Sequence, residues 1–320
     1  MVTAVPAVRN AVRSWLEKYE AGDKVLVAVS GGADSLALAH ALIVESKNLA
    51  ITVIGVTVDH QLQPQSSVQG ERVVHQLSQM GITCLIKKVN VEVKEGLEAS
   101  ARKARYNALN EVAQQESVVA IFLGHTQDDQ AETVLLGLAR GSGTRSLSGM
   151  AHHNGIYVRP LLEITRAQTE IFCKEVGLNF WCDPHNQDSQ FARVRVRKVA
   201  LPILEKTIGP GISEALARSA QLLRDDADAL DHWAKREELQ LDLSDLACAH
   251  LEQLPRAIRT RILRRAIYAA GAPAGSLSAE HVSVVEALIC AWNGQGAANL
   301  PGGVKVERIS GRLSLSTHRP

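Results

Sequence analysis

The segment that most restricts the fold is KVLVAVSGGADSLAL, residues 24–38. Its first six residues are mostly apolar, as in a strand that is buried on both faces of a parallel sheet. Gly31 and Gly32 follow directly, and the residues after them fit a helix. Such a turn suits an anion, because glycine lets the backbone approach the ligand and the first N–H groups of the helix are free.

This loop matches neither of the two common phosphate-binding motifs. It lacks the lysine of the Walker A loop and the glycine spacing of the dinucleotide fingerprint. Asp34 would repel a phosphate unless a cation such as Mg²⁺ lay between them. The alternative is a plain strand–turn–helix connection in which Asp34 caps the helix. We expect a phosphate site with Asp34 as the metal ligand, formed by Ser30, Gly31, Gly32, Ala33, Asp34 and Ser35.

Strand and helix patterns alternate along the chain as far as residue 177. This order builds βαβ units, so we expect an α/β fold with a doubly wound parallel sheet, whose ligands bind at the carboxyl ends of the strands. The expected strands are 24–29, 51–60, 83–91, 118–125 and 156–162, and the expected helices are 35–46, 68–80, 97–115, 128–140 and 165–177.

A chain of 320 residues suits about two domains rather than one core. The segment LPILEKTIGPGIS, residues 201–213, holds two prolines and two glycines, and we expect a hinge near residue 208. The following sequence is helical in pattern up to Trp292, and the alternating residues after it predict a hairpin. The predicted domains are therefore 1–208 and a smaller, mainly α-helical domain, 209–320.

Composition limits the class of protein. The net charge is only +1, so an RNA-binding surface would need clustered basic residues, such as RVRVRK (193–198) and RAIRTRILRR (256–265). The five cysteines are scattered, which fits a reducing compartment. No apolar run approaches the ~18 residues of a membrane span, and the N-terminus does not have the pattern of a secretory signal. We expect a cytoplasmic protein.

The segment HTQDDQAET, residues 125–133, combines a helix start with a cluster of carboxylates. Thr126 and Asp129 have the spacing of a capping box, and Asp128 and Glu132 share one helix face. The carboxylates either stabilise the helix or hold Mg²⁺ or the ammonium group of an amino-acid substrate. The residues expected beside the nucleotide, at the ends of two strands, are Asp59, His60, Gly124 and His125.

Several segments together resemble a known enzyme family. They are SGGADS (30–35), VTVDHQLQ (56–63), ARKARYNAL (101–109), LGHTQDDQAET (123–133), RPLLEITRAQ (159–168) and WCDPHNQDSQFARVRVRKVALPIL (181–204). The first is similar to the loop of the N-type ATP pyrophosphatase, or PP-loop, superfamily, and the set resembles the tRNA(Ile)-lysidine synthase family over residues 24–205. Two positions differ from that pattern: His185 stands where serine is usual, and Val194 where asparagine separates two arginines.

The resemblance implies an adenine nucleotide α-hydrolase-like fold and a two-step ligation. ATP, with Mg²⁺, would adenylate the C2 oxygen of the cytidine at the first position of the CAU anticodon of tRNA(Ile). The amine of free L-lysine would then displace AMP, giving lysidine and changing the specificity of the tRNA from methionine to isoleucine. Residues 1–208 would form the catalytic domain and 209–320 the tRNA-binding domain, with no membrane partner. The oligomeric state stays open, a homodimer included.

The resemblance also assigns roles to single residues. The implied catalytic residues are Asp34, Asp128, Asp129, Glu132, Arg105 and Arg193, and the implied nucleotide-binding residues are Ser30, Gly31, Gly32, Ala33, Asp34, Ser35, Asp59, His60, Gly124 and His125. Residues 191–198 fit either a helix, which places Arg193 and Arg197 together, or a strand, which adds Arg195 to them.

Two other functions remain open at this point. One is a different PP-loop enzyme, either a tRNA thiolase, which would be expected to carry paired cysteines, or an amide-forming synthetase, which would not need the basic clusters. The other is a nucleotide-binding regulatory module without chemistry. Release of pyrophosphate that depends on tRNA and lysine would separate all three.

Overall fold

The computed structural model describes residues 3–61, 66–92, 96–141, 143–183 and 188–317, and it divides into two compact units, Met1–Arg224 and Asp225–Pro320. Among the described residues, no helix is both long and apolar enough to cross a membrane.

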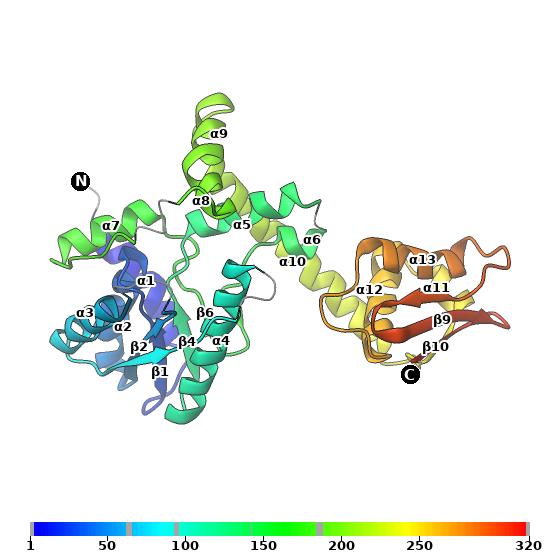
Figure 1. Ribbon diagram of the computed structural model, residues 1–320, viewed down its shortest axis with the longest axis horizontal. Coiled ribbons are helices and arrows are strands. Elements are labelled where there is room, and N and C mark those ends of the chain that lie inside the picture. The colour runs from blue at the N-terminus through cyan, green and yellow to red at the C-terminus, as the bar shows by residue number, and fades with distance from the viewer. Residues whose placement is uncertain (1–2, 62–65, 93–95, 142, 184–187, 318–320) are drawn as a thin grey trace. The chain divides into compact units, whose positions relative to one another are not determined.

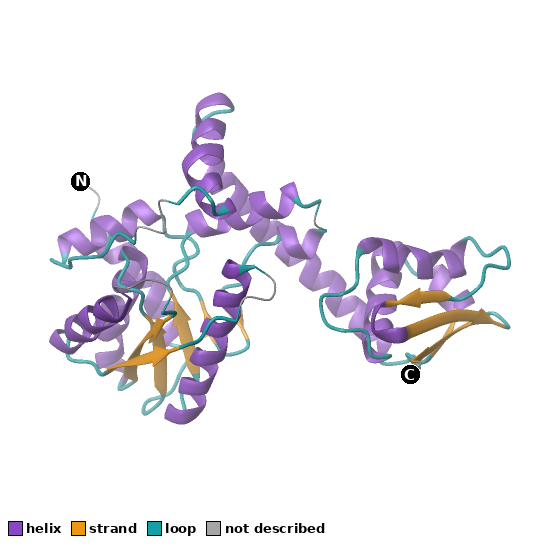
Figure 2. Ribbon diagram, in the orientation of Figure 1, coloured by secondary structure: helices purple, strands orange, loops and turns teal. Residues whose placement is uncertain are grey.

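The first unit is built on a six-stranded sheet in the order β3-β2-β1-β4-β6-β5. Figure 2 shows strands of this sheet with helices around them. Five strands run parallel, and only β5 is antiparallel, pairing with β6 at one edge. The predicted doubly wound parallel sheet is therefore confirmed. The strands are β1 (Lys24–Ala28), β2 (Thr52–Asp59), β3 (Cys84–Lys88), β4 (Ala120–Leu123), β5 (His153–Asn154) and β6 (Tyr157–Val158).

Helices cover both faces of this sheet (Figure 1). On β1, Val25 and Val27 pack on the face that α1, α2, α3 and α7 cover, whereas Leu26 packs with Leu109 of α4 on the other face. Burial on both faces explains why these strands are continuously apolar in the sequence. The helices are α1 (Val5–Leu16), α2 (Ala33–Ser46), α3 (Ser66–Gln79), α4 (Leu97–Glu116), α5 (Gln127–Ala139), α6 (Thr144–Leu147) and α7 (Arg166–Glu175), with a short 3-10 helix, η1 (Lys47–Leu49), after α2.

The chain leaves the sheet through a continuous run of helix. It comprises α8 (Ala192–Arg195), the π-helix η3 (Val196–Ala200) and α9 (Leu201–Thr207), and α10 (Ile212–Glu238) follows. The predicted break lies between α9 and α10, at residues 208–211. The compact units nevertheless divide later, between Arg224 and Asp225, because the first part of α10 belongs to the first unit, where Arg224 donates to the carbonyls of Ser148 and Gly149 at 2.7 Å each.

The second unit combines helices with a four-stranded antiparallel sheet in the order β7-β10-β9-β8. The expected hairpin is present as β9 and β10, and the three-residue strands β7 and β8, too short to show a pattern, extend it on either side. Its elements are β7 (Asp245–Ala247), α11 (Cys248–Gln253), α12 (Arg256–Ala269), α13 (Ala279–Cys290), β8 (Ala298–Leu300), η4 (Pro301–Gly303), β9 (Val304–Ile309) and β10 (Arg312–Thr317).

The five arginines of α12, expected from the sequence to face a nucleic acid, all donate hydrogen bonds within this unit. Arg256 and Arg259 both bind the buried carboxylate of Glu286 at 2.9 Å, and Arg259 also donates to the carbonyl of Leu254 at 2.9 Å. The other partners are Asp231 for Arg261, the carbonyl of Leu277 for Arg264 and Glu238 for Arg265. Much of this positive charge is therefore neutralised internally, and it stabilises the fold.

We predict that Glu286→Gln weakens the second unit. The Arg259 side chain is only 10% exposed, and a buried charge that loses its partner costs about 3–5 kcal/mol. We expect the free energy of local unfolding to fall by roughly 3 kcal/mol, measured by hydrogen exchange on peptides from α12 and β9. The control is Asp245→Asn, because Asp245 pairs with Arg312 where both side chains are about half exposed; it should lose less than about 1 kcal/mol. Equal losses in the two variants would contradict the prediction.

Candidate active site

A cavity of about 720 Å³ opens at the carboxyl ends of β1, β2 and β4, where a parallel sheet is expected to bind its ligand. Its volume falls in the usual range for a site that holds a ligand of nucleotide size. The predicted site residues that line it are Ser30, Gly32, Ala33, Asp34, Ser35, Asp59, His60, Arg105, Gly124, His125, Asp129 and Arg193.

The loop between β1 and α2 has the conformation that its glycines allow. Gly31 has φ +87°, a left-handed value that side chains disfavour, and a Cβ there would also collide with Gln69. The Ser35 hydroxyl donates to the Gly32 carbonyl at 2.9 Å and accepts the Ser30 N–H at 3.2 Å. The carbonyl of Gly31 accepts the N–H of Trp181 at 2.8 Å. Gly31 thus shapes the loop, while Ser30 and Gly32 face the cavity.

Gly124 brings the end of β4 against the start of α2. A Cβ at Gly124 would lie 3.0 Å from the carbonyl oxygen of Asp34 and 3.1 Å from the Cα of Ser35. Any other residue would force these two segments apart. The close approach places the HTQDDQAET segment directly beside the glycine loop.

Buried polar atoms in the cavity lack partners within the described part of the chain. They are Nδ1 of His60, Nδ1 of His125, Nε of Arg105 and Oε1 of Gln69. Buried polar groups in proteins are almost always hydrogen-bonded, so such a set points to a polar ligand. Burial, together with the charge of Arg105, lowers the pKa of both histidines, that of His125 to about 3. Both imidazoles are therefore neutral at pH 7. Asp59 ends β2 and accepts the N–H of Gln61 at 2.9 Å.

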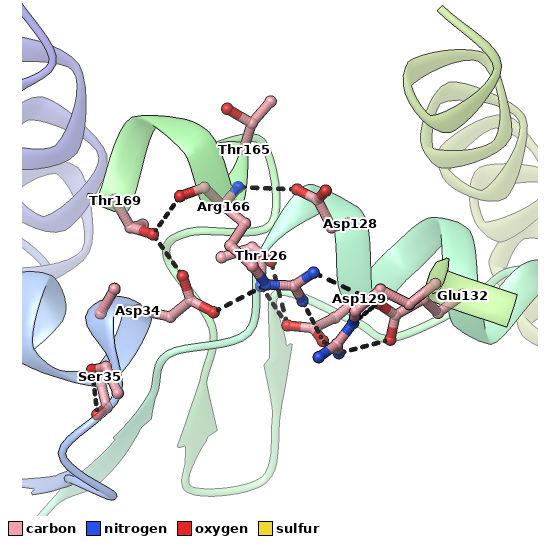
Figure 3. A network of polar contacts seen from close by, with 12 residues as sticks. Asp34, Ser35, Thr126, Asp128, Asp129, Glu132, Thr165, Arg166 and Thr169 are labelled. Carbon is pink, nitrogen blue, oxygen red and sulfur yellow. Dashed lines mark hydrogen bonds and ion pairs between the residues drawn. The ribbon is translucent and has the colours of Figure 1, made fainter. Parts of the chain in front are cut away.

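Asp34, the first acidic residue of α2, lies at the edge of the cavity (Figure 3). Its carboxylate accepts a short hydrogen bond from the Thr169 hydroxyl and lies 3.6 Å from Nε of Arg166. Burial raises its pKa to about 6 despite these two contacts. The ionised form is therefore held at a cost, which a metal ion would relieve.

The carboxylate of Glu132 is completely buried and surrounded by arginines (Figure 3). Arg197 Nε lies 2.6 Å from one carboxylate oxygen, and Arg193 Nε lies 2.8 Å from the other. Arg166 approaches the same carboxylate at 3.5 Å. Glu132 does not line the cavity, but it binds two guanidinium groups that do, those of Arg193 and Arg197, and contacts a third, that of Arg166.

Asp129 has the capping role that was one interpretation of the acidic segment, and it also lines the cavity. It forms the capping box, accepting the Thr126 N–H at 2.9 Å, and also pairs with Arg166 at 3.2 Å. Burial raises the pKa of Asp129, but the positive charges of Arg166 and its neighbours lower it by more. The net pKa is below the usual value, so Asp129 is ionised. Asp128 is placed differently: it is absent from the cavity lining and accepts the N–H of Arg166 at 2.8 Å, capping α7.

Three residues of this cluster escaped the sequence analysis as site residues. Arg166 and Thr169 belong to α7, which starts at the capping box of Thr165 and Gln168. Within RPLLEITRAQ, Thr165 and Gln168 form this cap, and no local pattern marks Arg166 or Thr169 as a site residue. Arg197 was noted only as a neighbour of Arg193, because the partner that unites them, Glu132, is distant in sequence.

Of the two readings of residues 191–198, the helix is confirmed. Ala192–Arg195 forms α8, and the π-helix that follows carries Arg197, so Arg193 and Arg197 meet at Glu132. Val194, unusual in its position, is buried. His185 lies outside the described residues.

The site fits a magnesium ion held jointly with a substrate. No group of three or more His, Cys, Asp or Glu side chains among the described residues is placed to hold a metal alone. Mg²⁺ commonly uses one or two protein carboxylates and completes its shell with phosphate oxygens and water. Asp34 beside the glycine loop meets this requirement, so a bound Mg²⁺ would neutralise phosphate charge there.

Comparisons with known proteins agree with this geometry. The PP-loop domain model matches residues 6–204, and the TilS substrate binding domain model matches residues 246–314. The tRNA(Ile)-lysidine synthase of Thermobifida fusca is 49% identical over 98% of this chain and 97% of its own. The same-named protein of Streptomyces coelicolor is 52% identical, covering 91% of this chain and 84% of its own.

Among solved structures, the U34-tRNA thiolase NcsA from Methanococcus maripaludis superposes with a TM-score of 0.58 at 20% identity, over 69% of this chain and 80% of that chain. At this identity the likeness concerns the fold alone. The family models and the near full-length relatives identify the family: the chain belongs to the tRNA(Ile)-lysidine synthases of the PP-loop superfamily.

Proposed function

We propose that this protein is an ATP-dependent ligase that joins lysine to C2 of the cytidine at the first anticodon position of tRNA(Ile). The product is lysidine, and the tRNA changes its specificity from methionine to isoleucine. The observation that carries the proposal is the pairing of two sites at one sheet edge: a glycine loop with an acidic residue, and a cluster of carboxylates directly beside it. The first suits a nucleotide and the second an amine.

In the first step, the C2 oxygen of the cytidine attacks the α-phosphate of ATP and pyrophosphate leaves. The loop from Ser30 to Ser35 offers backbone N–H groups to the phosphates, and Arg105 and Arg193 face the same cavity as candidates to neutralise charge that develops in the transition state. Asp34 would hold Mg²⁺ on the phosphates. His60, His125, Asp59 and Gly124 border the space left for the nucleoside.

In the second step, the lysine amine attacks C2 and AMP leaves. An ammonium group is not a nucleophile, so a carboxylate has to bind it and accept a proton. Asp129 is ionised and lines the cavity, which makes it the candidate for this contact, with Glu132 behind it. Asp128, which caps α7, would act on the site through Arg166.

The second unit, within which the substrate-binding domain model falls, is the proposed tRNA-binding part. A thiolase is the less favoured alternative. The described cysteines are Cys84, Cys173, Cys182, Cys248 and Cys290, and none of them belongs to a group placed to hold a metal. The relatives at 49–52% identity carry the synthase name.

The proposal predicts which substrates release of pyrophosphate requires. With ATP and Mg²⁺ we expect release to need a tRNA(Ile) with the CAU anticodon, and lysine to be consumed with it. Asp34→Ala should reduce turnover by more than about tenfold, or roughly 1.4 kcal/mol of barrier, with the fold intact by circular dichroism. Turnover without tRNA would contradict the proposal, and so would an unimpaired variant.

A second prediction concerns pH. The pKa of Asp34 is about 6 in the folded protein and near 3.8 when unfolded, so folding takes up a proton between these values. The resulting stabilisation is complete below about pH 4 and is lost as the pH rises through about 6. Asp34→Asn cannot titrate. Relative to this variant, the wild type should therefore lose about 3 kcal/mol of unfolding free energy between pH 3 and 7. Urea denaturation measures this, and parallel pH profiles would contradict it.

A further inference from the structure

Arg166 contacts both halves of the proposed site, the glycine loop with Asp34 and the carboxylates of α5. It is the first residue of α7, and its guanidinium lies between the two halves of the site (Figure 3). Nε faces the Asp34 carboxylate at 3.6 Å, while Nη2 and Nη1 face Asp129 at 3.2 Å and Glu132 at 3.5 Å. It is thus a single cation shared by the carboxylate of the nucleotide loop and those of the amine site.

The backbone of Arg166 is fixed while its side chain borders open space. Asp128 accepts its N–H at 2.8 Å, and the capping box of Thr165 holds the start of α7. The side chain is 22% exposed and lines the cavity. Its longer contacts, 3.2–3.6 Å, contrast with the 2.6 and 2.8 Å of Arg197 and Arg193 on Glu132. Arg166 is therefore shared among three carboxylates and bound closely to none of them, whereas Arg193 and Arg197 are each bound closely to Glu132.

Arg166 and the ammonium group of a substrate would compete for the negative charge of Asp129. Arg166 is the arginine nearest to the Asp129 carboxylate, at 3.2 Å, against 3.7 Å for Arg197 and 3.9 Å for Arg193, so an incoming ammonium group would compete with it first. The phosphates of ATP bring negative charge into the same cavity, and guanidinium groups bind phosphate well. If phosphate draws Arg166 away, Asp129 loses its nearest cation, and the remaining arginines lie 3.7 and 3.9 Å from the same oxygen, which then can receive an amine.

We propose that Arg166 is a positioning residue that makes lysine binding depend on bound nucleotide. ATP with Mg²⁺ engages Asp34 and attracts Arg166, and the amine then replaces Arg166 at Asp129. Binding is ordered, nucleotide first, so that lysine does not occupy the site without the cosubstrate. This inference rests on the proposed function, because it takes lysine as the amine.

The test measures lysine affinity by calorimetry, on the full-length protein, with and without a non-hydrolysable ATP analogue and Mg²⁺. In the wild type we expect the analogue to tighten lysine binding by roughly tenfold or more, within the range of ordinary coupling between sites. Arg166→Gln should bring this ratio close to one, mainly by tightening lysine binding in the absence of the analogue.

Two variants separate coupling from structural support. Arg197→Gln removes a guanidinium that binds Glu132 at 2.6 Å, lies farther from Asp129, at 3.7 Å, and forms no ion pair with Asp34 within the described residues, so this variant should retain most of the coupling. Arg166→Lys keeps the charge and should restore at least part of the coupling, which guards against a folding defect in Arg166→Gln. If a folded Arg166→Gln protein kept the wild-type ratio of lysine affinities with and without the analogue, this inference would be wrong, but the proposed function would stand. A wild type that binds no lysine in either state would overturn the proposed function as well.

Discussion

The site depends on one fully buried carboxylate, that of Glu132. Arg166 of α7, Arg193 of α8 and Arg197 of the π-helix all converge on it, although they lie far from it in sequence. A buried charge without partners would cost several kcal/mol, and Arg193 and Arg197 supply the close partners of Glu132, at 2.8 and 2.6 Å, while the carboxylate holds them in turn. These ion pairs join α5 to α7, α8 and the π-helix, which contribute the three arginines to the cavity.

The arrangement leaves the site with carboxylates and guanidinium groups in near balance. Asp34 and Asp129 face the cavity, as do the three arginines. Each of these groups can exchange its partner within the protein for a ligand. Asp34 can bind a metal ion in place of Arg166, an arginine can bind phosphate in place of a carboxylate, and Asp129 can bind an ammonium group in place of Arg166. Such exchanges cost little, because one charged contact replaces another in the same environment.

Much of the fold, and the cavity formed by the glycine loop and the ends of β2 and β4, could be predicted from the sequence. The strand–GG–helix pattern around Gly31 and the acidic segment after β4 are local signals, and parallel topology brings strand ends together. The arginine contacts could not be predicted, because they depend on tertiary packing. Arg193 and Arg197 meet only if residues 192–200 are helical, and the sequence also permitted a strand. The arginines of α12 suggested an RNA surface, yet Glu286, Asp231 and Glu238 bind four of the five.

The most direct test of the central claim is chemical analysis of the product. A transcript of tRNA(Ile) with the CAU anticodon would be incubated with the protein, ATP, Mg²⁺ and isotopically labelled lysine, then digested and analysed by mass spectrometry. The account predicts that the cytidine at the first anticodon position gains the mass of labelled lysine less one water, and that the cytidine of the tRNA(Met) anticodon does not. Label at another nucleotide, or sulfur in place of lysine, would contradict it.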